Sequence, residues 1–130
     1  MSGILAGAAT TDITPLLGVS IAGLFDDRKA VDIDDPLHAK AVVLDDGDCR
    51  IAMVVLDLIG VAGEHAQAIR ALVSENTGIP GDHVLIACTH THTGPTIQDI
   101  YDCKHDEAYV QWMIRRAADT VSLAVCRLQP

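Results

Sequence analysis

The sequence predicts an α/β fold, in which one mixed sheet combines a β-hairpin with a parallel strand–helix–strand–helix unit. Short β-prone apolar runs at residues 39–44, 51–56 and 84–88 alternate with helical apolar patterns at residues 63–76 and 106–128. Hydrophobic residues make up 49% of the chain and aromatic residues only 3%, so the core is aliphatic. Such a core is typical of buried strands covered by helices. At 130 residues, we expect a single unit over residues 1–130.

The first part of the chain supplies the antiparallel strands. Residues 4–11 form a short strand, and residues 39–44 and 51–56 form two more, joined by the hairpin signal Asp45-Asp46-Gly47-Asp48. Residues 51–56 are apolar on both faces, as a central strand is. The turn-rich residues 15–36 form a long irregular segment, and segments of this kind are often functional.

The second part supplies the parallel unit. The helix at residues 63–76 ends at Gly78, and the helix at residues 106–128 keeps the 3, 4, 7 apolar spacing and begins at Asp106, which can cap it. Because a helix joins them, the strands at residues 51–56 and 84–88 are expected to be parallel and adjacent.

Charge and composition exclude several classes of partner. The net charge of −9 argues against nucleic acid and anionic membranes, which both require clustered basic residues. No apolar run approaches the roughly 20 residues of a membrane span, and the N-terminus lacks the pattern of a secretory signal. The four cysteines are dispersed and are interpreted as free thiols. We therefore expect a cytoplasmic protein without a transmembrane segment, with secretion of a processed form left open.

The candidate site is the run Cys88-Thr89-His90-Thr91-His92-Thr93-Gly94-Pro95, which follows the apolar residues 84–87. In an extended segment, residues two apart point to the same side, so His90 and His92 are expected to project together, roughly 6.5–7 Å apart at the backbone. Two imidazoles at a strand end, followed by a Gly-Pro turn, indicate half of a metal or catalytic site. A polar loop with hydrogen-bonding histidines is the simpler alternative.

A carboxylate is expected beside the two histidines. In open α/β sheets, ligands bind beyond the carboxyl ends of the strands. Asp57 follows one parallel strand, and His90 and His92 follow the other. All three are therefore predicted to face one crevice.

Several short segments resemble, in order, the N-terminal part of neutral/alkaline non-lysosomal ceramidases and their bacterial relatives. The specific element is Ala87-Cys88-Thr89-His90-Thr91-His92-Thr93-Gly94-Pro95. The weaker elements are Gly7-Ala8-Ala9-Thr10-Thr11-Asp12-Ile13-Thr14-Pro15, Gly23, Ala39-Lys40-Ala41-Val42-Val43-Leu44 and Leu56-Asp57-Leu58. The resemblance covers nearly the whole chain.

The resemblance implies a zinc-dependent amidohydrolase that cleaves the amide between a sphingoid base and a fatty acid. It implies that His90 is a zinc ligand, that His92 lies beside the substrate and holds the developing oxyanion, and that the backbone of Gly23 borders the substrate pocket. Zinc accepts imidazole nitrogen and lowers the pKa of bound water toward ~7. Asp57 is the nearest candidate for the acceptor that orients a ligating histidine, and we include it among the catalytic residues.

The chain departs from the family in detail and in length. It has Thr93 where the family often has Ser, and Thr96 where ceramidases usually continue with Gly. The family domain extends a few hundred residues further and supplies another His, a Glu and a Tyr to the zinc. We therefore expect residues 1–130 to be an incomplete portion of a larger α/β hydrolase domain, inactive alone and acting on a small-molecule or lipid amide when complete.

Two alternatives remain open. A non-catalytic α/β scaffold that assembles or forms a homo-oligomer would keep the same fold. A His-x-His metallohydrolase of the amidohydrolase barrel type is disfavoured by the Thr-Gly-Pro continuation.

The remaining polar residues have simpler interpretations. The scattered histidines, His38, His65, His83 and His105, are expected in surface or capping roles. Cys88 is interpreted as a small buried residue. Arg28 either faces the pocket or is a solvated loop charge.

Overall fold

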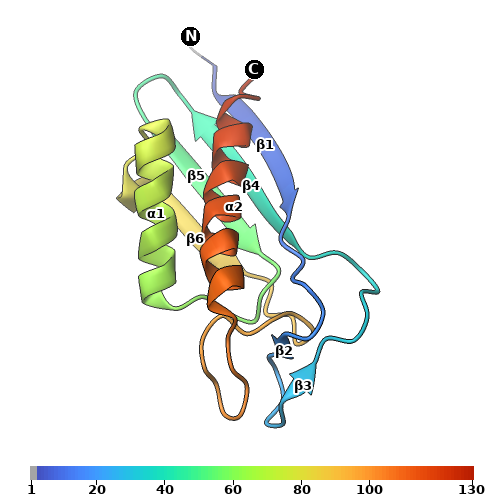
Figure 1. Ribbon diagram of the computed structural model, residues 1–130. Helices are drawn as coiled ribbons and strands as arrows, with labels where there is room; N and C mark the ends of the chain where they lie inside the picture. The colour runs from blue at the N-terminus through green and yellow to red at the C-terminus, as the bar shows by residue number, and fades with distance from the viewer. Residues whose placement is uncertain (1–2) are drawn as a thin grey trace.

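The computed structural model describes residues 3–130 as two layers, a four-stranded sheet with two helices on one of its faces (Figure 1). The sheet contains β1 (Leu5–Asp12), β4 (His38–Asp45), β5 (Arg50–Leu56) and β6 (Val84–Cys88). The helices are α1 (Gly63–Thr77) and α2 (Glu107–Val125), and a single 3₁₀ turn, η1 (Gly81–His83), precedes β6. A small hairpin, β2 (Ser20–Ile21) and β3 (Arg28–Lys29), lies outside the main sheet.

The strand order is β1-β4-β5-β6. β4 pairs antiparallel with both β1 and β5, and β5 pairs parallel with β6, with Ala52 opposite Val84 and Leu56 opposite Cys88. The predicted fold class is therefore confirmed, including the hairpin, the central position of β5 and the adjacent parallel pair. The parallel pair matters for function because it brings the segments after β5 and β6 to the same edge of the sheet.

The core lies between the sheet and the helices. α2 packs on β1 and β4, and α1 packs against α2. Alternate residues of β1, β4 and β5 face the helices and are buried, as in Ala39, Ala41 and Val43 of β4. The opposite face of the sheet carries no helix in the described chain and exposes apolar side chains, among them Val42 and Leu85.

The helix ends follow local chemistry. The Asp106 side chain accepts a hydrogen bond from the Tyr109 amide and caps α2, as predicted. Gly78 ends α1 in a left-handed conformation with φ 76°. α2 ends at Val125, three residues before the predicted end at 128, because Gln129 pairs with Ala6 at the edge of β1 through two backbone hydrogen bonds of 2.9 and 3.0 Å. Within residues 3–130, neither helix has the length and apolar character needed to cross a membrane.

Candidate functional site

The histidine motif occupies the loop directly after β6, and its backbone is held by the end of β5. The Thr89 amide donates to the Leu56 carbonyl, and the His90 amide donates to the Leu58 carbonyl, both at 3.0 Å. β6 ends at Cys88 and His90 has a φ of 63°, in the left-handed region that histidine enters more readily than branched residues. The prediction that both histidines extend an ordinary strand is therefore wrong, because the chain turns at His90.

The two imidazoles nevertheless lie together. Their ring centroids are 5.0 Å apart, with an angle of 71° between the ring planes. Both residues are exposed. The left-handed turn at His90, rather than strand alternation, brings the rings edge to face.

The His90 ring is oriented by a main-chain acceptor. Its Nδ1 lies 2.7 Å from the Ile59 carbonyl oxygen. Because a carbonyl oxygen can only accept, Nδ1 carries the proton, and in the neutral ring Nε2 is left as the basic nitrogen. This is the tautomer in which an imidazole binds a metal through Nε2.

Asp57 does not orient this ring. Its carboxylate accepts from the His38 amide at 2.9 Å and lies 3.6 Å from the Lys40 ammonium. Both partners belong to β4, and β4 and β6 flank β5 on opposite sides. The expected orienting role of Asp57 is wrong for His90, and its contacts instead fasten the end of β5 to the start of β4.

His92 is packed against Gly23, a contact that joins residues far apart in the sequence. Gly23 has a φ of 115°, and a Cβ atom built there would lie 2.6 Å from both Cβ and Cγ of His92. Only glycine fits at this distance. The structure thus brings together Gly23, His90 and His92, three of the four residues selected from the sequence.

The β2–β3 hairpin holds the motif loop through its backbone. The Ala22 amide donates to the Gly94 carbonyl, and the Thr96 amide donates to the Ser20 carbonyl, both at 3.0 Å. The guanidinium of Arg28, on β3, donates to the His92 carbonyl at 2.7 Å. Arg28 therefore faces the motif rather than solvent, a choice that the sequence left open because the partner lies 64 residues away.

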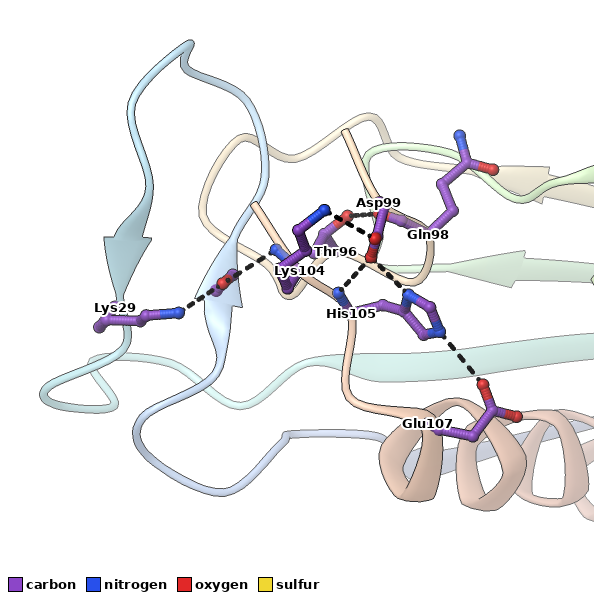
Figure 2. A network of polar contacts seen from close by, with 8 residues as sticks. Lys29, Thr96, Gln98, Asp99, Lys104, His105 and Glu107 are labelled. Atoms are coloured by element: carbon purple, nitrogen blue, oxygen red, sulfur yellow. Dashed lines mark hydrogen bonds and ion pairs between the residues drawn. The ribbon is translucent and has the colours of Figure 1, made fainter. Parts of the chain in front are cut away.

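The loop that follows the motif is tied down by a charged network (Figure 2). Asp99 accepts from the Lys104 ammonium at 2.9 Å and from His105 Nδ1 at 2.7 Å, while His105 Nε2 lies 3.1 Å from a Glu107 carboxylate oxygen. Bonding to Asp99, and then to Glu107, raises the pKa of His105. His105 therefore fastens the entry to α2, in line with the expected surface or capping role.

Cys88 is half-buried, and desolvation raises the pKa of its thiol. A raised pKa keeps the thiol protonated, which is the opposite of what a nucleophilic cysteine requires. The interpretation of Cys88 as a small packing residue agrees with this environment.

Two further observations describe the surroundings of the histidines. Within residues 3–130, no group of three or more His, Cys, Asp or Glu side chains is arranged to hold a metal ion. A cavity of about 330 Å³ lies on the motif side of the irregular segment, and Thr93, Gly94 and Pro95 form one of its walls. Neither His90 nor His92 lines it, so the imidazole pair stands on an open surface.

Comparison with known proteins identifies the fold. No family model and no curated protein matches the chain. Among solved structures, neutral ceramidase from Pseudomonas aeruginosa matches with a TM-score of 0.89 and 22% sequence identity. A ceramidase described as complexed with C2 matches with a TM-score of 0.83, also at 22% identity. Each match covers 100% of this chain and 22% of the other chain. The chain therefore has the fold of a portion of bacterial neutral ceramidase, as its sequence resemblance implied.

Proposed function

We propose that this chain is the histidine-bearing part of a zinc-dependent hydrolase that cleaves amide bonds in N-acyl sphingoid bases. The observation that carries the proposal is the imidazole pair: His90, with Nδ1 bonded to Ile59, stands 5.0 Å from the ring of His92. The similarity in fold to neutral ceramidase supports the proposal of a hydrolase. Both the substrate class, N-acyl sphingoid bases, and the metal, zinc, are parts of this proposal.

The residues present fit one position of a zinc site. Catalytic zinc is bound by at least three protein side chains and keeps a position for water, and imidazole is among its preferred ligands. His90 offers Nε2 in the required tautomer and with its ring already fixed, which lowers the entropic cost of binding. The further ligands are assigned to polypeptide outside residues 3–130, since the described side chains supply no group of three.

His92 is placed to act on the substrate. Zinc, when bound, supplies a water of lowered pKa and polarises the acyl carbonyl. In this proposal, His92 would stand beside that carbonyl and would donate an N–H to its oxygen as negative charge develops there. Because Gly23 and the motif backbone hold His92, little reorganisation accompanies this donation.

Exposed apolar side chains that follow Gly23 in the chain support a lipid substrate. Leu24 and Phe25 directly follow Gly23, and they are 52% and 74% exposed. Phe25 contacts Tyr101 edge to face, with ring centroids 4.9 Å apart. Exposed apolar side chains of this kind mark a surface for an apolar partner, here one chain of the substrate.

The experiment measures hydrolysis of a short-chain N-acylsphingosine by the full-length protein that the gene encodes, with zinc supplied. We expect turnover in the wild type, no turnover in His90→Gln, and full turnover in His105→Gln, which removes a histidine from the Asp99 network instead. Equal turnover in the wild type and His90→Gln would refute the proposal. A folded wild-type protein that hydrolyses no N-acyl amide would favour the scaffold alternative.

A further inference from the structure

Arg28, on the small hairpin outside the main sheet, occupies an unusual position for a charged residue. Its side chain is half-buried, and its Nη2 donates to the His92 carbonyl at 2.7 Å and to the Ala22 carbonyl at 3.3 Å. Its Nε atom is buried and has no hydrogen-bond partner in the described chain. Burial of an incompletely paired guanidinium is costly, so the contacts that Arg28 makes must offset that cost.

The neighbouring Lys29 shows what an ordinary surface cation does in the same hairpin. Its side chain is 51% exposed and pairs with Asp27 at 2.9 Å. Arg28 has no carboxylate partner within residues 3–130, and its Nη2 donates to two main-chain carbonyls instead. Both bonds come from Nη2, whose two N–H groups can each serve one carbonyl, and the positive charge strengthens both hydrogen bonds.

The two carbonyls belong to the two sides of one contact. Ala22 precedes Gly23, and Gly23 is the residue whose backbone packs on the His92 side chain. One nitrogen of Arg28 therefore joins the turn after β2, which carries Gly23, to the loop that carries His92. Without the guanidinium, only the Ala22–Gly94 hydrogen bond and packing would hold Gly23 against His92.

We propose that Arg28 is a positioning residue, which fixes the His92 imidazole against Gly23 and beside His90. The effect of Arg28 on catalysis rests on the proposed function, whereas its effect on the position of His92 does not. Arg28 acts through the backbone of His92 and touches no reacting atom.

The structural test is NMR on the 130-residue chain labelled with ¹⁵N and ¹³C. In Arg28→Ala, we expect the contact between Gly23 Hα and the His92 ring to disappear, and amide exchange at Ala22 to accelerate about tenfold or more. Exchange at Thr89 should not change, because its amide is held by β5. Arg28→Lys should keep part of the contact, since an ammonium keeps the charge and several N–H donors but ends a different side chain from Nη2.

Arg127→Ala is the matched control. Arg127 also donates to a main-chain carbonyl, that of Ala8 at 3.3 Å, but lies after α2 and away from the motif. An unchanged Gly23–His92 contact in Arg28→Ala would overturn the proposal. If Arg28→Ala does not fold, Arg28→Gln, which keeps a polar side chain but has no charge and is shorter, decides, and an unchanged Gly23–His92 contact there would overturn the proposal equally.

The catalytic arm uses the longest natural product of the gene and N-acylsphingosine. We expect Arg28→Ala to lower kcat by about 10²-fold with a smaller change in KM, because a misplaced oxyanion donor affects the transition state more than binding. An unchanged kcat in a variant that has lost the Gly23–His92 contact would overturn the catalytic consequence. A wild type without turnover would instead count against the proposed function and leave the NMR result to judge Arg28.

Discussion

Replacing Gly23 by Ala tests the contact on which the site is built. The new Cβ would lie 2.6 Å from Cβ and Cγ of His92, whereas ordinary contacts begin at 3.4 Å, so a shift of about 0.8 Å is required. The His92 Cα would lie only 2.8 Å from the new Cβ, so rotation of the ring cannot relieve the overlap. The φ of 115° adds a backbone cost of about 1–3 kcal/mol. We expect a total destabilisation of roughly 2–4 kcal/mol.

The assay is urea unfolding combined with the NMR signals of the His92 ring. Gly18→Ala is the matched control, because Gly18 has a similar φ of 92° but open space around its Cα. It should show the backbone cost alone, about 1–2 kcal/mol, with His92 signals unchanged. Equal destabilisation in the two variants, with His92 undisturbed in both, would refute the packing of His92 on Gly23.

Two further predictions concern the entry to α2. Asp106→Ala should lower the free energy of unfolding by about 1 kcal/mol, because the Tyr109 amide loses its acceptor. Asp106→Asn should keep most of this stabilisation. Equal urea midpoints for wild type and Asp106→Ala would contradict the cap. His105 has a raised pKa from Asp99 and Glu107, so its stabilising contribution is complete below the unfolded pKa of about 6.5 and is lost as pH rises through the folded pKa. The stability difference between wild type and His105→Gln should therefore shrink as pH rises, and a difference independent of pH would count against this network.

The sequence predicted the main sheet because its signals are local. The hairpin residues 45–48, the apolar runs and the helix stops each act within a few residues, and the parallel pairing of β5 with β6 follows from the helix between them. The end of α2 was misplaced because Gln129 pairs with Ala6, a contact that no periodicity contains.

The site was predictable in its residues and less so in its geometry. The motif predicted His90 and His92 as site residues. Alternation along a strand was the wrong reason for their proximity, because hydrogen bonds to the end of β5 set a left-handed φ at His90. Asp57 follows β5 as expected, yet its carboxylate turns to β4. Arg28 could be assigned only once the hairpin was seen against the motif.

The most direct test of the account is the ¹⁵N NMR response of the histidine rings of the 130-residue chain to added Zn²⁺. We predict that Nδ1 of His90 is protonated before zinc is added, and that zinc shifts the Nε2 resonance of His90 first and most strongly. His105, held between two carboxylates, should respond little by comparison. A His90 ring that is protonated on Nε2, or that is unaffected while other histidines take up zinc, would contradict the assignment of His90 as the metal ligand.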